Sequence, residues 1–460
     1  MKYLLTNKVL KMRDKRKSML NFLITGMLMM VLTTAWSQNQ KLIIGNNSGT
    51  SYNATVVSDK SDLITLKFNL YELNLNEVKT EYGLAYTVSS PKAPNFLIKG
   101  SPDLIYLTGS LIIPETGSME IEVIAGDYEE YKDIEIAPSK GNLTRDVYPN
   151  QIPFEKGLVY KKNEFFPNQL ASLRDPYVLR DYRGQTVEIY PVQYNPVTKT
   201  LRVYSEITVV LKHTNDRGIN EFVDQRANKA IYAEFDNIYR RNFLNYSHRA
   251  KYQPIEDNGL LLVVAYPAFM DAIKPYVNWK KQKGQEVKLV SYTEAGGTSA
   301  NLKNYITNQY NSDEGLCFVL LVGDGPQIPP LYKGGDSDAA YGHIVGTDSF
   351  AEAFIGRFSA ENVAQVQTQV DKTITYERDL TADDTWLTTG MGIASSEGGG
   401  GQGDNGESDI QHMNIIRNKL LNYTYSTVYQ VYDPGAQAST VVANLNTGTS
   451  IINYTGHGAT

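Results

Sequence analysis

The stretch Leu316-Cys317-Phe318-Val319-Leu320-Leu321-Val322 carries no polar side chain other than a single thiol. A short, wholly apolar run of this kind is typical of a strand that is covered on both faces. Leu260–Ala265 has the same character, and helical patterns at 268–283 and 299–310 separate the strands of this region. Strands that alternate with helices predict right-handed crossovers and a mainly parallel sheet.

A second round of the same alternation follows. Val363, Val366, Val370 and Ile374 recur at helical spacing, and Ser359 is predicted to cap this helix. Beyond it we expect a strand that ends at 394, a helix at 408–422, a strand at 427–432, a helix from 439 and a last strand to 454.

The region before these rounds has a different pattern. From about residue 40 to 211, short β-rich runs are separated by Gly, Pro, Asn and Asp clusters. This predicts an antiparallel sandwich or barrel, which by composition alone could also be a general binding module. Residues 221–251 are polar and helix-permissive, as in a linker or a short packing helix between two cores.

The N-terminus has the features of an export signal. Basic residues up to Lys17 precede an apolar run at 19–32, and Ala35-Trp36-Ser37 has the small-x-small pattern of a cleavage site. We therefore predict a signal peptide over residues 1–37. A membrane anchor is the alternative, although the run is short for a spanning helix.

Length, charge and cysteine content narrow the class of protein. A chain of 460 residues suggests two or three domains. The formal net charge is −6 and the pI about 5.6, which argues against nucleic acid as a partner and fits calcium better. One cysteine excludes an internal disulfide.

The last strand-like run ends in Thr455-Gly456-His457-Gly458. In an open parallel sheet the binding crevice lies beyond the carboxyl ends of the strands. The two glycines leave the imidazole accessible, and the backbone N–H of Gly458 could face a developing oxyanion. His457 is therefore a candidate acid–base residue, and a histidine in an ordinary surface turn is the alternative.

Three motifs carry a resemblance to a known family: IASSEGG at 393–399, DNGESDIQH at 404–412 and NYTGHG at 453–458. They resemble the gingipain family of secreted cysteine peptidases, close to its arginine-specific members. The resemblance extends from about Gly141 to Thr460. It implies a β-sandwich propeptide followed by an α/β caspase-like catalytic domain with mainly parallel sheets, truncated at its C-terminal end.

The resemblance also implies a division of the chain. The predicted parts are a signal peptide (1–37), a β-rich propeptide (38–220), a linker with a maturation site near Lys251 (221–251), a catalytic subdomain A (252–386) and a partial catalytic subdomain B (387–460).

Roles for individual residues follow from the same resemblance. His457 matches the family's catalytic histidine, Glu397 the glutamate that orients the imidazole, and Gly458 lends an oxyanion N–H. Asp409 matches the aspartate that selects an arginine side chain, because one carboxylate can pair with a guanidinium through two hydrogen bonds. For Asp409, helix capping is the alternative.

The one cysteine of the chain does not suit the role of catalytic nucleophile. Cys317 is the one cysteine, and inside an apolar strand a thiol is a small inert hydrophobe. The family's nucleophilic cysteine lies on the next strand after the histidine. We therefore expect these 460 residues to lack it and to be inactive as they stand.

Calcium is the cofactor that the resemblance implies, a hard cation that takes six to eight oxygen ligands. The matching positions are Asp324, Asp348 and Glu352, the backbone carbonyls of Val345 and Phe350, and at a second site Glu407 and His412. A solvated acidic loop is the alternative.

The sequence thus predicts the precursor of a secreted cysteine endopeptidase that cuts protein or peptide substrates after basic residues, arginine before lysine. We expect it outside a bacterium or on its surface, with its own propeptide and the type IX secretion machinery as candidate partners. Two alternatives stay open: a sortase-like peptidase of the type IX secretion system, and a non-catalytic surface protein on a peptidase scaffold.

Overall fold

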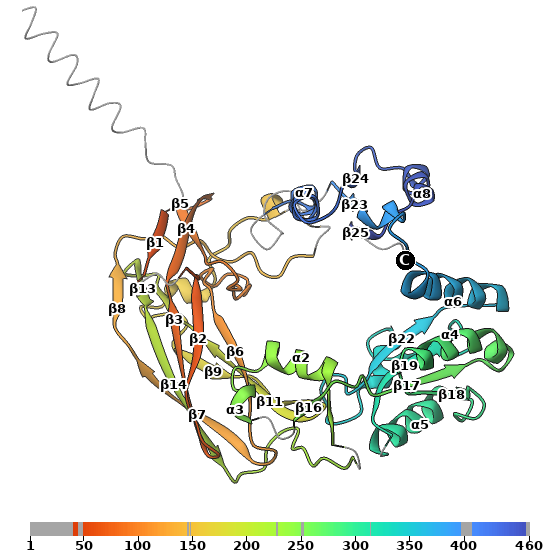
Figure 1. Cartoon of the computed structure of the whole chain (residues 1–460). Helices are drawn as coiled ribbons and strands as arrows, with labels where there is room; N and C mark the ends of the chain where they lie inside the picture. Colours follow the sequence, from red (N-terminus) through yellow and green to blue (C-terminus); the bar gives the residue numbers. More distant parts are fainter. Residues whose placement is uncertain are drawn as a thin grey trace, which may run out of the picture.

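Antiparallel sheets build the first half of the chain and parallel sheets the second, as predicted (Figure 1). The computed structural model describes residues 40–44, 49–144, 147, 149–226, 229–249, 253–312, 314–396 and 407–456. The predicted signal peptide lies outside them. No helix of this described part is both long and apolar enough to cross a bilayer.

Two antiparallel sheets form the first sandwich of the N-terminal half. Ile64, Leu66, Phe68 and Leu70 alternate with more exposed neighbours, so one face of their strand is buried. The first sheet has the order β2 (Tyr52–Asp59), β3 (Leu63–Leu70), β14 (Glu206–Thr214), β7 (Ser118–Ala125). The facing sheet contains β10 (Tyr177–Leu179), β11 (Tyr182–Ile189), β6 (Leu107–Ile112) and β9 (Ala171–Leu173).

A second pair of three-stranded antiparallel sheets encloses its own apolar core. One has the order β1 (Gln40–Ile43), β4 (Glu72–Thr80), β5 (Gly83–Ser89), and the other β12 (Val192–Asn195), β13 (Thr200–Tyr204), β8 (Tyr128–Tyr131). Leu73, Leu75, Tyr194 and Leu201 are buried between them. The sandwich prediction for this half is therefore confirmed.

The first parallel sheet has helices on both faces. Its order is β18 (Val287–Ser291), β17 (Leu260–Ala265), β19 (Leu316–Val322), β22 (Phe354–Phe358). Helices α4 (Met270–Gln282) and α6 (Val363–Arg378) share a core with one face, and α5 (Ser299–Asn311) with the other. Every residue of β17 is buried, as its apolar composition predicts.

Helix α6 does not begin as predicted. Its N-cap is Asn362, whose side chain accepts a hydrogen bond from the backbone N–H of Gln365. The Ser359 hydroxyl instead donates to the Asp324 carboxylate at 2.6 Å, so it serves the loop after β19 rather than the helix.

The second parallel sheet is smaller and has the order β24 (Thr427–Tyr432), β23 (Thr389–Ala394), β25 (Ile451–Thr455). Gly392 on β23 faces Met413 of α7 (Asp409–Leu421), whereas the neighbouring Met391 contacts Asn444 of α8 (Ala438–Thr447). Successive strand residues point to opposite faces, so the two helices cover opposite sides, as Figure 1 also shows.

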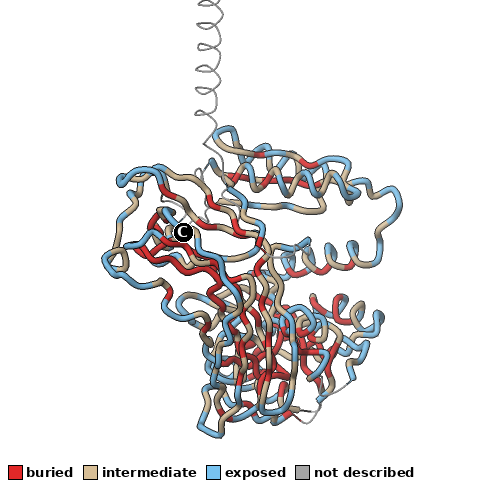
Figure 2. Tube along the Cα trace, turned by 90° about the vertical axis from the view of Figure 1, so that its left-hand side faces the viewer, coloured by how far each residue is buried: buried red, intermediate tan, exposed pale blue. Residues whose placement is uncertain are grey.

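The junction of the two halves is a packed aromatic core rather than a solvated linker. Strand β15 (Ile231–Tyr232) pairs with β16 (Pro254–Ile255), and α2 (Ala233–Asn242) and α3 (Tyr246–Arg249) lie between them in sequence. The buried rings are those of Tyr177, Tyr182, Tyr232, Phe235, Tyr239, Phe243 and Tyr246. Of the two alternatives for 221–251, the structure has the packing helix. Buried stretches run through the interior of the trace, and exposed ones form most of its outer loops (Figure 2).

Cys317 belongs to this junction core. It is fully buried at a bulge in β19, where Leu260 pairs with Leu316 and Leu261 already pairs with Phe318. Burial raises the pKa of the Cys317 thiol to about 12. The thiol thus has the surroundings of the inert core residue that the sequence predicts.

A labelling experiment checks this prediction. A thiol whose pKa is raised to about 12 is almost entirely protonated near neutral pH, so very little reactive thiolate is present. We expect Cys317 to resist iodoacetamide in the native protein and to react fully in guanidinium chloride, read by mass spectrometry. Cys317→Ala is the control that takes up no label, and complete labelling of the native protein would contradict the assignment.

Candidate active site and cation loop

The carboxyl ends of β23 and β25 lie together at one edge of the second parallel sheet. Ala394 is in register with Thr455, and the backbone N–H of Ser395 donates to the Thr455 carbonyl at 2.9 Å. The predicted Glu397, His457 and Gly458 follow these two strand ends directly but lie outside the described residues. The register therefore brings the carboxyl ends of β23 and β25 to the same edge of the sheet.

Asp409 lies at this edge too. Its side chain is 3% exposed, and its Oδ2 accepts a hydrogen bond of 2.7 Å from the Ser395 hydroxyl, which directly follows β23. A buried carboxylate thus lies within hydrogen-bond distance of the residue that follows β23.

Asp409 lies in the first turn of α7, where the capping alternative expects an acidic residue, but it is not the N-cap residue itself. The N-cap of α7 is Ser408, whose side chain accepts from the Gln411 N–H while the Gln411 side chain accepts from the Ser408 N–H. This capping box satisfies the helix start without the Asp409 carboxylate, which is turned to Ser395 instead.

A glycine lets α7 approach β23 closely enough to place Asp409. A Cβ on Gly392 would lie 2.6 Å from Cγ and 2.8 Å from Sδ of Met413. Any larger residue would push the helix away from the strand and move Asp409 with it.

The second candidate site is the loop between η4 (Ala339–Gly342) and β22, which we call the cation loop, residues 344–352. Glu352 closes it: its carboxylate is completely buried, and Oε2 accepts from the N–H groups of Ile344 and Val345 at 2.7 and 3.0 Å. Burial raises the pKa of Glu352 to about 7, although these two N–H groups favour the charged form. Its Oε1 has no hydrogen-bond partner in the described part of the chain.

Other predicted ligands lie in the same loop. Asp348 Oδ1 accepts from the Phe350 N–H at 2.9 Å, and Oδ2 accepts from the Val178 N–H at 2.8 Å. The negative charge of Asp348 lies near enough to Glu352 to raise the pKa of that carboxyl. The structure thus gathers Val345, Asp348, Phe350 and Glu352 in one loop.

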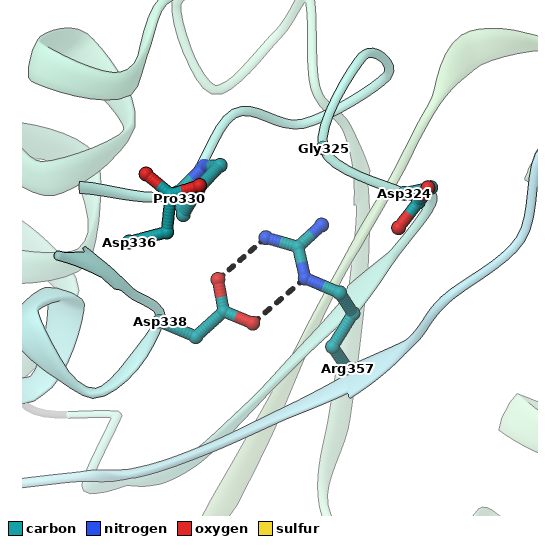
Figure 3. Close-up of a pocket in the computed structure, with 6 residues that line it drawn as sticks. All are labelled: Asp324, Gly325, Pro330, Asp336, Asp338 and Arg357. Carbon is teal, nitrogen blue, oxygen red and sulfur yellow. Dashed lines mark hydrogen bonds and ion pairs between the residues drawn. The ribbon is translucent and has the colours of Figure 1, made fainter. Parts of the chain in front are cut away.

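Asp324 does not join them. It follows the carboxyl end of β19, whereas Glu352 precedes the amino end of β22, and these strands are parallel and in register from Phe318 with Phe354. Strand β22 alone spans five residues, or about 16 Å at about 3.3 Å per residue. Asp324 instead lines a pocket of about 230 Å³ with Gly325, Pro330, Asp336, Asp338 and Arg357 (Figure 3).

In that pocket the one basic side chain already has a carboxylate partner. Arg357 donates from Nε and NH2 to the two oxygens of Asp338 at 2.7 and 2.6 Å, and from NH1 to the Gly323 carbonyl. Hydrogen bonds from Ser359 and the Gly325 N–H lower the pKa of Asp324.

The predicted second cation pair lies at the start of α7. Glu407 Oε1 and His412 Nδ1 are 2.8 Å apart. Within the described residues no three His, Cys, Asp or Glu side chains converge on a metal position. A cation at either place would therefore need backbone oxygens as well, which calcium accepts.

A buried cluster of charged residues at the junction was not predicted from the sequence pattern. Arg180, Asp181 and Arg226 are all at most 3% exposed. Arg226 bridges Asp181 and Asp224 at 2.6 and 2.7 Å, and the Tyr239 hydroxyl donates to Asp181. From a single sequence, charged residues between strands are expected to be exposed. Their burial is recognised only once the structure shows which partners they contact.

Comparison with known proteins agrees with this architecture. The C25 propeptide model (Propeptide_C25) matches residues 46–253, and the model of peptidase family C25 matches residues 255–460. The chain therefore belongs to peptidase family C25 and carries that family's propeptide. The boundary between the two matches falls at the β16 segment of the junction.

The chain is similar in sequence to two curated proteins of this family. The chain is 41% identical over 408 residues to Gingipain R1 of Porphyromonas gingivalis, covering 87% of this chain and 41% of that protein. It is 40% identical over 410 residues to Gingipain R2 of the same species, covering 88% and 55%. It thus spans about two fifths to just over half of the length of these curated relatives.

One solved structure among the matches is described as the Arg specific cysteine proteinase gingipain R. It has 40% sequence identity and a TM-score of 0.42, over 45% of this chain and 49% of that one.

The close contact of α7 with β23 can be tested by filling Gly392. Gly392→Ala should lower the free energy of unfolding by about 1–3 kcal/mol, because the added methyl overlaps Met413. Gly356→Ala is the matched strand control, since the nearest atom to its Cβ is 3.9 Å away. Urea unfolding measures both, and equal midpoints would contradict the proposed packing.

Proposed function

We propose that this protein is the precursor of a cysteine endopeptidase that cleaves after basic residues, arginine before lysine. The observation that supports it most is Asp409, a buried carboxylate beside the carboxyl end of β23. A guanidinium that reaches this carboxylate would leave water for a charge-assisted, two-pronged contact. The identity of 40–41% to Gingipain R1 and Gingipain R2 supports the choice of arginine.

The proposed chemistry needs a thiolate, an imidazole and an oxyanion donor. We assign the imidazole to His457, which would take the thiol proton and return it to the leaving amine. Glu397 would accept the second imidazole N–H, and the N–H of Gly458 would donate to the oxyanion. The shared edge of β23 and β25 supports this grouping.

Cys317 has no part in the proposed mechanism. It lies at the start of β19 in the junction core, fully buried, and burial raises its pKa. A nucleophile needs a lowered pKa and access to substrate. The 460 residues hold no second cysteine, so the proposal requires one outside them.

The N-terminal features support export, and we propose that the protein acts outside the bacterium or on its surface. Residues 1–37 would direct export. The propeptide would remain a partner of the peptidase part through the junction core.

We also propose calcium as the resident cation of the loop 344–352. The fit rests on Glu352, whose Oε1 is buried without a partner, a costly state that a cation would relieve. Asp348 and the carbonyls of Val345 and Phe350 would supply further oxygens. When bound, calcium would hold this loop in shape; the reacting atoms lie elsewhere.

Asp409 provides the test of substrate selection. In the full-length gene product, Asp409→Asn should lower kcat/KM for arginyl peptides by about 30- to 4000-fold, the range for truncating one side of a buried charge pair. Asp371→Asn, on the outer face of α6, is the matched control. Arginine cleavage that survives in Asp409→Asn would rule out this pocket and favour the sortase-like alternative.

Calcium can be tested without any activity measurement. We expect added calcium to raise the melting temperature, and Glu352→Gln to remove that response, because the amide loses the charge that attracts the cation. Magnesium is the control, since its strict octahedral shell suits a loop of carbonyls poorly. A melting temperature indifferent to calcium and to chelator would count against the site.

A further inference from the structure

A hairpin of the propeptide holds the cation loop. Strands β10 and β11 are joined at Arg180 and Asp181, with Leu179 paired to Tyr182. The backbone N–H of Val178, on β10 of this hairpin, donates to Asp348 Oδ2 at 2.8 Å. The ring of Tyr177 stacks on Phe350 with centroids 4.2 Å apart.

Arg180 makes the deepest contact. Its NH1 donates to the Glu352 carbonyl at 2.5 Å, and its side chain is only 2% exposed. The rings of Phe235 and Tyr310 lie 4.4 and 5.4 Å from its guanidinium carbon. A positive charge is thereby buried against the backbone of the residue that closes the loop.

Asn220, which lies outside the hairpin, also contacts the cation loop. The side-chain oxygen of Asn220 accepts from the N–H and the hydroxyl of Thr347, both at 3.0 Å. Its amide group donates to the Pro176 carbonyl, just before β10. Four propeptide residues therefore contact one loop of the peptidase part: Tyr177, Val178, Arg180 and Asn220.

The donors of the hairpin face the oxygens that a cation would need. The Val178 N–H donates to Asp348 Oδ2, and the backbone N–H of Arg180 lowers the pKa of the Glu352 carboxyl. The Arg180 guanidinium adds a buried positive charge against the backbone carbonyl of Glu352, and a positive charge at this loop repels a second cation.

We propose that the cation loop is a shared site, held by the propeptide hairpin in the precursor and by a divalent cation once the hairpin leaves. This rests on the calcium site proposed above. Hairpin and cation then oppose each other, and by linkage each weakens the binding of the other by the same factor. Calcium would thus promote release of the propeptide and stabilise the peptidase part that remains.

Calcium affinity of the whole chain tests the coupling. Arg180 has φ +49°, a conformation that glycine adopts without strain, so Arg180→Gly removes the guanidinium and keeps the turn. Asp181 keeps Arg226 and Tyr239 as partners in this variant. Isothermal titration with calcium should show Arg180→Gly binding at least about tenfold more tightly than wild type.

Two controls accompany it. Glu352→Gln should abolish binding in both backgrounds. Arg202→Ala removes a propeptide arginine that pairs with Glu130 away from the loop, and it should leave the affinity unchanged. Circular dichroism confirms that each variant folds.

A reverse measurement covers the case in which Arg180→Gly fails to fold. A specific protease site inserted after Arg249 allows wild type to be cut, and size-exclusion chromatography follows dissociation of the two parts. Calcium should speed dissociation at least about tenfold, and chelator should prevent this.

Each outcome decides between the proposals. Equal calcium affinity in wild type and Arg180→Gly, or dissociation that ignores calcium, overturns the shared site while the calcium site stands. No calcium binding in any variant overturns both, but leaves the peptidase proposal to the Asp409 experiment. Tighter binding in Arg202→Ala as well would show a general loosening of the chain and overturn the role of the hairpin.

Discussion

Parallel pairing of β25 with β23 is the constraint on which the candidate active site depends. Because Ala394 and Thr455 are in register, two segments some sixty residues apart in sequence leave the sheet at the same edge. Asp409 is then brought there by α7, which lies close to β23 over Gly392. A shift of register by one residue would turn every side chain to the other face.

The junction between the two halves combines apolar burial with buried charges. Its aromatic rings supply apolar burial, and inside them lie two arginines and an aspartate that share hydrogen bonds with tyrosines and backbone. Burying such charges costs solvation that only well-placed partners offset. A junction of this kind tolerates little adjustment, so it suits a contact that is either complete or released, as a propeptide contact must be.

Much of the architecture follows from sequence pattern alone. Apolar runs such as Leu316–Val322 separated by helical periods specify a parallel sheet, since only a strand buried on both faces lacks alternation. The inert setting of Cys317 follows from the same run. The prediction of Ser359 as the cap is wrong because Asn362, three residues on, is an equally good capping residue, and local pattern cannot choose between them.

What the sequence by itself determined is the order of elements, the class of each sheet and the residue types that chemistry would need. Tertiary structure alone decided which of those residues meet. It separated Asp324 from the loop of Asp348 and Glu352 by the length of a strand, and it buried Arg180 against Glu352 across the junction. Periodicity reports which face of an element is apolar, whereas the meeting of distant polar groups depends on register and packing that no local pattern encodes.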